Sequence, residues 1–328
     1  MGEFFRTGLR IFAAVIIMAF TVNVYGQAEM SEVVEAFNSG VTMMKMNPDA
    51  AILSFEKAIT LANEVGEEAD EIKDQASKQI PKMYWESAKT LAGKKDYDGA
   101  LARLDACVES SKAVGDNAQA SRASSTALSI LNAQGSEALS EKRYEDALGY
   151  FDNALSREPR YAKAYLGKVL VYDEMKDYEK MKETALLGIE TANSTRDTKT
   201  SGDIEKKVRG TFFNNAQESM MAKDYSSAID NLNKSIEFGN SSSITFYQLG
   251  LAQEGIEKWN DAIVSFNKAL EIEMGGDADK AKIYFELGKS YQAVSNDTNA
   301  CASYKKALHG EFAEAAKYQI ENVLKCAN

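Results

Sequence analysis

The residues that most often carry out chemistry are scarce in this sequence of 328 residues. It contains one histidine, His309, and three cysteines, Cys107, Cys301 and Cys326. A tetrahedral zinc site takes several such ligands at characteristic spacings, and a lone histidine without a Cys-x-x-Cys pair does not supply them. The sequence also contains no glycine-rich phosphate loop, nucleophile-elbow serine or calcium-loop motif. It therefore predicts no metal site and no cofactor.

Neighbouring carboxylates could act as a general acid and a general base, and pairs such as Glu67–Glu68 and Asp173–Glu174 are present. Charged residues make up 27% of the chain, so these pairs are better explained as solvated helix faces. We therefore predict that the protein is not an enzyme.

The cysteines are predicted to be free thiols. Cys107 occupies a position that alanine fills elsewhere in the chain, which favours a small buried packing residue. Cys301 and Cys326 fall on the last two expected helices, about 8 and 16 residues from the turn near Gly310. At about 1.5 Å per residue this places them roughly 10 Å out of register. A disulfide needs Cα atoms within about 7 Å, so no bond between them is expected.

The elements that would position any binding residue follow a repeated pattern. A small, a large apolar and a small residue recur four and three positions apart, which places them on one helix face. The seven triplets are Ala51–Phe55–Ala58, Ala100–Leu104–Cys107, Ala147–Phe151–Ala154, Met181–Ala185–Gly188, Ala228–Leu232–Ser235, Ala262–Phe266–Ala269 and Ala300–Tyr304–Ala307. Each triplet marks the second helix of a hairpin that must bury its apolar face against a neighbouring hairpin.

The leading residues of successive triplets are 49, 47, 34, 47, 34 and 38 positions apart. A two-helix unit with a period of 34 residues resembles the tetratricopeptide repeat (TPR) family. The matching residues are Phe246, Leu249, Gly250, Ala262, Phe266 and Ala269 in one repeat, and Tyr284, Leu287, Gly288, Tyr291, Ala300, Tyr304 and Ala307 in the next. The resemblance implies an all-α, right-handed α-solenoid of about seven hairpins with a C-terminal capping helix. It implies packing and not a particular chemistry.

We expect this TPR superhelix to occupy residues 27–328. Its predicted repeats are 32–65, 81–114, 128–161, 162–195, 209–242, 243–276 and 281–310, and its capping helix is 311–326. Residues 66–80 keep a helical apolar stripe and are predicted to be helical, although Pro81 would kink or end a helix. The polar run 193–203 is predicted to be a flexible loop, with Asp203 as the cap of the helix that follows.

Large apolar residues recur where a partner could bind. The residue after the leading aromatic or leucine of each first helix should face the inner surface of the superhelix. Burying one such side chain contributes about 1.5–3 kcal/mol, so three or four would support micromolar binding. The predicted partner-binding residues are Trp85, Lys89, Leu166, Phe213, Tyr247, Leu251, Phe285 and Lys289. The alternative is that the protein's own helices already cover them.

The first 26 residues predict export. Arg6 and Arg10 precede an apolar run at 11–22, and Val24-Tyr25-Gly26 provides a plausible cleavage site. This run of about 12 residues is shorter than the roughly 20 that span a bilayer. We expect a signal peptide at 1–26 and a mature protein in the bacterial periplasm. The alternative is an uncleaved anchor in the inner membrane with the chain facing the periplasm.

A formal net charge of −11 and the lack of a basic stripe argue against nucleic-acid binding. The predicted function is a non-enzymatic scaffold that binds a peptide or an envelope protein in its groove. One alternative is a module for a small ligand or glycan, in which Trp85, Tyr247 and Trp259 would stack on sugar faces. The other is a structural component that associates with further copies of itself.

Overall fold

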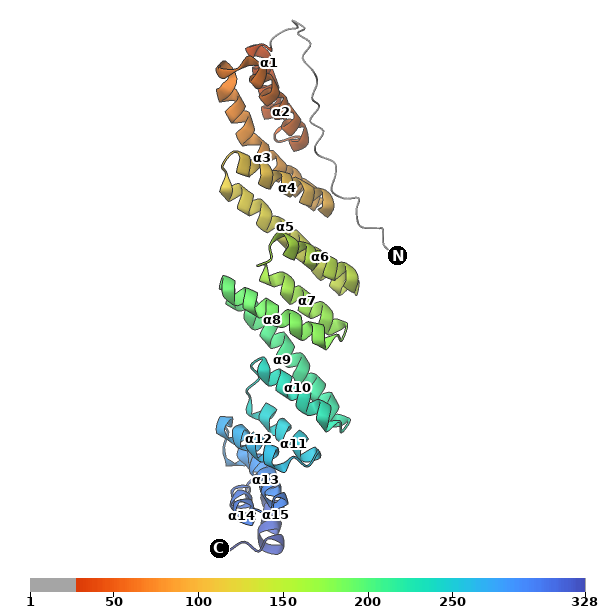
Figure 1. Ribbon diagram of the computed structural model, residues 1–328, viewed down its shortest axis with the longest axis vertical. Coiled ribbons are helices and arrows are strands. Elements are labelled where there is room, and N and C mark those ends of the chain that lie inside the picture. The colour runs from red at the N-terminus through yellow and green to blue at the C-terminus, as the bar shows by residue number, and fades with distance from the viewer. Residues whose placement is uncertain (1–27, 328) are drawn as a thin grey trace. The chain divides into compact units, whose positions relative to one another are not determined.

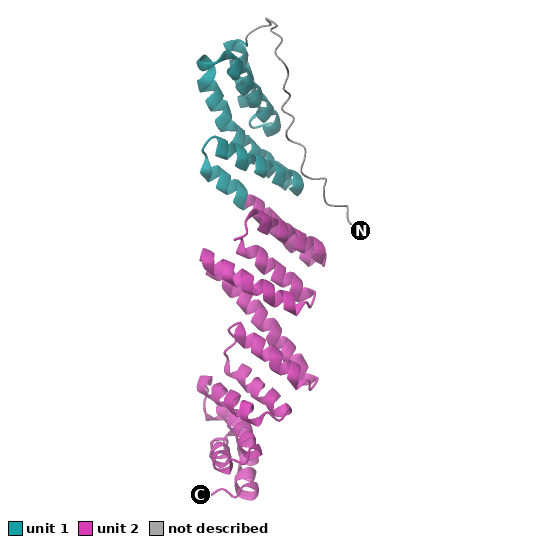
Figure 2. Ribbon diagram, viewed as in Figure 1, with its two compact units in different colours: residues 1–125 teal, residues 126–328 magenta. Residues whose placement is uncertain are grey.

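The computed structural model describes residues 28–327, so the predicted signal peptide lies outside the described residues. Within this range the chain is α-helical, with short 3-10 and π turns and no β-strand (Figure 1). It forms two compact units, residues 1–125 and 126–328 (Figure 2). The prediction of an all-α protein built from helix hairpins is confirmed.

Unit 1 begins with two helix hairpins. Their elements are α1 (Met30–Met43), α2 (Pro48–Val65), the 3-10 turn η1 (Glu67–Ala69), α3 (Asp70–Gly93) and α4 (Tyr97–Ala113). Each helix packs on the next, and α1 also contacts α3. Helix α5 (Asn117–Ser140) starts in unit 1 and ends in unit 2.

Unit 2 continues the same arrangement. Its helices are α6 (Tyr144–Arg157), α7 (Ala162–Glu174), α8 (Tyr178–Thr195), α9 (Thr198–Met221), α10 (Tyr225–Glu237), α11 (Ser243–Gly255), α12 (Trp259–Ile272), α13 (Asp277–Ala293) and α14 (Asp297–Lys306). Each helix from α6 to α14 contacts its successor. The first helices of neighbouring hairpins also meet, as α7 meets α9 and α11 meets α13.

Glycines on the first helices make room for the aromatic residue of several triplets. Phe151 and Phe266 are at most 1% exposed. A Cβ on Gly167 would lie 2.3 Å from the Phe151 ring, and one on Gly250 would lie 2.5 Å from the Phe266 ring. Because any larger residue would collide with a buried ring, the glycine and the ring together set the distance between the helices.

Six hairpin turns share one backbone geometry. In each, a residue with φ between 58° and 62° follows the first helix, and the next residue is the N-cap of the second. These left-handed residues are Lys95, Lys142, Lys176, Lys223, Glu257 and Ser295. In three turns the N-cap is an aspartate that accepts a backbone N–H bond from three residues later, as Asp224 does from Ser227 at 3.1 Å. The shared turn fixes the register of each pair of helices.

The structure supports one of the two predictions made for the segments 66–80 and 193–203 and contradicts the other. Gly66 is not helical, but residues 67–80 are, as predicted: 67–69 form the η1 turn and 70–80 belong to α3, which also contains Pro81. The loop predicted at 193–203 is wrong, because α8 runs to Thr195 and α9 starts at Thr198. Arg196 takes the left-handed conformation, and Asp197 accepts hydrogen bonds from the backbone N–H and the hydroxyl of Thr200 at 3.1 and 2.7 Å. Asp197 is therefore the cap, in place of Asp203.

The capping segment at the C-terminal end is less regular than a single helix. The capping helix predicted at 311–326 consists of the 3-10 turn η2 (Gly310–Phe312), α15 (Ala313–Tyr318) and the π-helical turn η3 (Gln319–Val323). Ala316, Ile320 and Leu324 still cover the apolar end of the last hairpin, as the cap was expected to do.

Cys301 and Cys326 form a disulfide, with Cα atoms 5.8 Å apart, so the prediction of free thiols is wrong for this pair. The prediction assumed a straight helix up to Cys326. After η3 the tail turns back, and the Lys305 ammonium donates to the Ala327 carbonyl at 2.7 Å, which brings Cys326 beside α14. Cys107 is free and fully buried, as expected.

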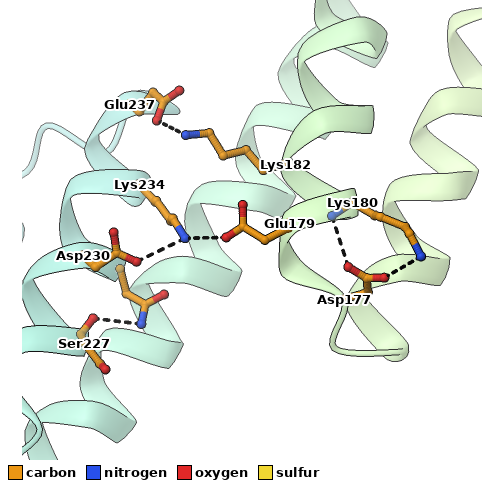
Figure 3. A network of polar contacts seen from close by, with 9 residues as sticks. Asp177, Glu179, Lys180, Lys182, Ser227, Asp230, Lys234 and Glu237 are labelled. Atoms are coloured by element: carbon orange, nitrogen blue, oxygen red, sulfur yellow. Dashed lines mark hydrogen bonds and ion pairs between the residues drawn. The ribbon is translucent and has the colours of Figure 1, made fainter.

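Ion pairs link the second helices of two neighbouring hairpins in unit 2 (Figure 3). Lys234 of α10 lies 2.8 Å from Glu179 of α8 and 3.1 Å from Asp230, and Lys182 of α8 lies 2.6 Å from Glu237. The hydrogen bond to Glu179 is the main cause that raises the pKa of Lys234. Because the carboxylates are largely exposed, each pair contributes modestly, at about 0.2–1 kcal/mol.

Candidate partner-binding faces

The sequence-predicted binding residues all lie on first helices. Trp85 and Lys89 are on α3 in unit 1. In unit 2, Leu166 is on α7, Phe213 on α9, Tyr247 and Leu251 on α11, and Phe285 and Lys289 on α13. Since α11 contacts α13 and α7 contacts α9, unit 2 brings its predicted residues together in two neighbouring pairs of helices (Figure 1).

The apolar members of this set are half-buried. Leu166 and Phe213 each pack against a hydrophobic cluster of unit 2. The Phe285 ring centroid lies 5.5 Å from those of Tyr304 and Phe312, and the Tyr247 centroid lies 5.9 Å from that of Phe266. The protein's own residues therefore cover part of each ring, and the rest of each half-buried side chain is in contact with solvent.

Three exposed apolar residues on α1 and α11 were not predicted from the sequence. Val34 and Val41 of α1 are 37% and 46% exposed, and Ile244 of α11 is 46% exposed. They flank an aromatic residue at i, i+3 and i+7, as Val34–Phe37–Val41 and Ile244–Tyr247–Leu251, so each trio shares one helix face. On α11 this spacing is a signal that could have identified Ile244, because it lies one helical turn before the predicted Tyr247. No binding residue was predicted on α1.

A buried carboxylate stands beside Tyr247 and Leu251. Glu254 of α11 has 8% of its side chain exposed and accepts hydrogen bonds from the Ser290 hydroxyl at 2.8 Å and the Lys289 ammonium at 3.3 Å. Burial raises its pKa, against the opposing effects of Ser290 and Lys289. Lys289 also pairs with Glu286, so two carboxylates share one ammonium. Burial alone would lower the pKa of Lys289, but these two carboxylates outweigh it and raise it.

The same surroundings act on Tyr247. Burial, followed by the negative charges of Glu286, Glu254 and Glu311, raises the pKa of Tyr247 to about 12. Its hydroxyl therefore stays protonated at any physiological pH and is available as a hydrogen-bond donor or acceptor. The Lys282 ammonium lies 5.5 Å from the centre of the Tyr247 ring, which places the lysine of α13 beside the aromatic residue of α11.

Unit 1 places different charges around its predicted residues. The Arg122 guanidinium lies 4.3 Å from the centre of the Trp85 ring, a distance typical of a cation–π contact. Lys89 forms an ion pair with Glu86 at 2.8 Å. The surroundings of Trp85 are therefore more basic than those of Tyr247.

Neither face is a deep pocket. One depression, with a volume of about 600 Å³, is lined by α3 and α4, including Asp70, Lys73, Ile80 and Val114, and includes none of the predicted binding residues. The described part of the chain contains no cluster of three or more metal-binding side chains. Between residues 28 and 327, no helix combines the length and apolar character needed to cross a bilayer. Open surfaces of this kind suit contact with another polypeptide better than enclosure of a small molecule.

Glu254 gives a prediction about pH. A raised pKa means that the folded state binds the proton more tightly than the unfolded chain does. The resulting stabilisation is complete below the unfolded value, near 4.5, and is lost as the pH rises through the folded pKa. The difference in unfolding free energy between Glu254→Gln and the parent protein should therefore shift in favour of the variant from about pH 4 to pH 7. Urea unfolding of both proteins across this range measures it, and a constant difference would contradict the assignment.

No family model and no curated protein matches the sequence. Solved structures of repeat proteins align with part of it. One of MamA from Desulfovibrio magneticus RS-1 is 15% identical, covers 58% of this chain and 96% of its own, and has a TM-score of 0.31. YrrB, described as a TPR protein with an unusual peptide-binding site, is 19% identical over 63% of this chain and 96% of its own, with a TM-score of 0.30.

TTC0263, a thermophilic TPR protein from Thermus thermophilus, is 17% identical over 60% of this chain and 99% of its own, with a TM-score of 0.27. At these identities and TM-scores, the likeness carries no argument about what this chain binds.

Proposed function

We propose that this chain of tetratricopeptide-like helix hairpins is a non-enzymatic scaffold that holds a peptide or a protein segment against the open faces of its first helices. The observation that supports this most directly is the combination of half-buried aromatic rings with exposed apolar neighbours. Tyr247 and Leu251 are half-buried, and Ile244 on the same face of α11 is 46% exposed. Covering each side chain would contribute up to about 1.5–3 kcal/mol, so a few suffice for micromolar binding.

The proposed location is the periplasm, reached through the leader predicted at 1–26. The disulfide between Cys301 and Cys326 supports this independently, since structural disulfides persist in oxidising compartments and are rare in the cytosol. Fractionation of cells that express the full chain separates a processed periplasmic form from one that is anchored in the inner membrane. Recovery of the reduced protein in the cytosolic fraction would contradict the proposal.

Photo-crosslinking in intact cells tests the binding face. The crosslinking amino acid benzoylphenylalanine replaces Ile244 on α11 and, in a matched control, Val264 on the second helix α12, which is 69% exposed. We expect a discrete crosslinked species from position 244 that is absent from position 264. Equal labelling from both positions, or none from position 244, would count against a binding face on α11.

The glycan alternative receives less support. Of its three proposed stacking residues, Trp85 belongs to unit 1 and has Arg122 over its ring. Trp259 is the first residue of α12, whereas Tyr247 lies on the open face of α11. A sugar-binding platform needs adjacent, accessible rings, and no described contact joins these three.

A further inference from the structure

One helix of each unit carries the same surface pattern, α3 in unit 1 and α13 in unit 2. The left-handed residues Lys95 and Ser295 follow α3 and α13, with φ values of 62° and 58°, and give both helices a common register. Trp85 and Phe285 each stand ten residues before this turn. Around them, residues 82–89 and 282–289 have the same Lys, Tyr, Glu and Lys: Lys82 and Lys282, Tyr84 and Tyr284, Glu86 and Glu286, Lys89 and Lys289.

The first helices of the two preceding hairpins, α1 before α3 and α11 before α13, also match each other. Helices α1 and α11 both carry an apolar residue, an aromatic, an amide, a glycine and an apolar residue in the same order: Val34 and Ile244, Phe37 and Tyr247, Asn38 and Gln248, Gly40 and Gly250, Val41 and Leu251. Both glycines lie against a buried phenylalanine of the next helix, where a Cβ would be 2.7 Å from Phe55 or 2.5 Å from Phe266. The two helices therefore have the same register in their hairpins.

Within each unit, these paired helices are neighbours, since α1 contacts α3 and α11 contacts α13. We name the two surfaces after their units. The unit 1 face consists of Val34, Phe37, Val41, Lys82, Trp85 and Lys89. The unit 2 face consists of Ile244, Tyr247, Leu251, Lys282, Phe285 and Lys289.

The local contacts repeat too. Lys89 pairs with Glu86, and Lys289 pairs with Glu286, three residues earlier in each case. A cationic group lies over each equivalent tyrosine, with Arg103 at 6.0 Å from the centre of the Tyr84 ring and Lys306 at 5.2 Å from that of Tyr284. The two faces thus share these two kinds of contact. They differ beside the aromatic residue of the second trio, because Arg122 lies over the Trp85 ring whereas Phe285 packs on Tyr304 and Phe312.

The hairpins between them lack the pattern. The equivalent positions hold Ser129, Asn132 and Ser136 on α5, and Gly210, Phe213 and Gln217 on α9. On α7 they hold Lys163, Leu166 and Leu170. An apolar trio followed by a lysine–aromatic–lysine trio is therefore not a packing requirement of every repeat.

The charge of the partner is inferred from Lys82 and Lys282, the first residues of the two lysine–aromatic–lysine trios. Lys82 contacts the side-chain oxygen of Gln79 at 3.4 Å, and Lys282 lies over the Tyr247 ring. Among the described residues neither ammonium is close enough to a carboxylate to form an ion pair, although the chain carries a net charge of −11. Lys282 acts at longer range on Glu273, whose pKa is lowered mainly by the backbone N–H of Gly275 and in part by this lysine. An apolar segment with an acidic residue at its end complements both the apolar trio and this lysine.

We infer that the chain is bivalent: the unit 1 face and the unit 2 face each bind one copy of the same apolar, acidic polypeptide segment. This inference rests on the proposed scaffold function and adds the number of sites and the chemistry of the partner. Two sites on one chain would let it hold two copies of a segment, or bind a partner with two such segments more tightly than either face alone.

The test titrates the full mature chain with a fluorescein-labelled synthetic peptide that has leucines along one helical face and a glutamate at each end. Calorimetry and fluorescence anisotropy should give two peptides per chain. Val34→Glu with Val41→Glu should remove one, and Ile244→Glu should remove the other. Val264→Glu, on an exposed part of α12, should still bind two. Lys82→Glu with Lys282→Glu should weaken binding about tenfold, by removing one charge pair at each face.

The outcomes separate this inference from the proposed function. One peptide per chain, sensitive to only one set of variants, would overturn bivalence and leave a single-site scaffold. No binding of this peptide, together with a specific crosslink from position 244, would overturn the assigned partner chemistry but not the scaffold. Equal binding of a matched peptide with lysines in place of its glutamates would overturn the role of Lys82 and Lys282.

Discussion

Replacing Phe151 by alanine is expected to lower the free energy of unfolding by about 3–5 kcal/mol. The ring is 1% exposed, and it lies against Gly135 of α5 and Gly167 of α7, where added Cβ atoms would come within 2.6 and 2.3 Å of it. Its loss therefore leaves a cavity against two different helices. Urea unfolding followed by circular dichroism measures the change, and a loss below about 1 kcal/mol would contradict this account of the packing.

A pair of glycines provides the matched control for this prediction. Gly167→Ala should destabilise by about 1–3 kcal/mol, because the new methyl group collides with the Phe151 ring. Gly149→Ala on α6, where no atom lies within 4 Å of the added Cβ, should stabilise by about 0.5–1 kcal/mol through helix propensity. Effects of the same sign at both positions would show that the ring does not set the helix spacing.

Removing the disulfide should have the second-largest effect. Cys301→Ser with Cys326→Ser opens a link between residues 25 positions apart. In the chain-entropy account, closing such a loop stabilises the folded protein by about 3.5 kcal/mol. Thermal unfolding of the parent protein with and without a reducing agent measures the same quantity.

The double variant is its own control in that experiment. Its remaining cysteine, Cys107, is free and fully buried, so a reducing agent should not change its melting temperature. If the parent protein melts at one temperature in both conditions, the disulfide contributes nothing to stability.

The helix hairpins could be predicted from the sequence because their cause is local. Residues four and three apart, such as Ala262, Phe266 and Ala269, share a face in any α-helix, and only a second helix can cover that face. The loop predicted from the polar run at 193–203 was wrong because polar composition alone does not show whether a residue is packed inside a helix. Thr200 and Ser201 are 4% and 6% exposed, so small polar residues there are packed inside a helix and do not form a loop.

The disulfide depends on tertiary contacts that the sequence pattern does not contain. The distance between Cys301 and Cys326 is set by the π-helical turn and by the hydrogen bond from Lys305 to Ala327, which turn the tail back toward α14.

The candidate faces could be predicted in part. Tyr247 and Phe285 follow from the repeat pattern, but Val34 and Val41 require the register of Gly40 against Phe55, which the short turn of the first hairpin obscures.

The disulfide also determines how the chain would respond to a pulling force. Tension that arrives at Cys326 passes directly through the sulfur–sulfur bond to Cys301 on α14, so the residues between them are shielded from it. Extended, this 25-residue segment would add roughly 80 Å to the length of the polypeptide. In an oxidising environment this length is not released, and the C-terminal end unfolds under tension only when α14 separates from α13.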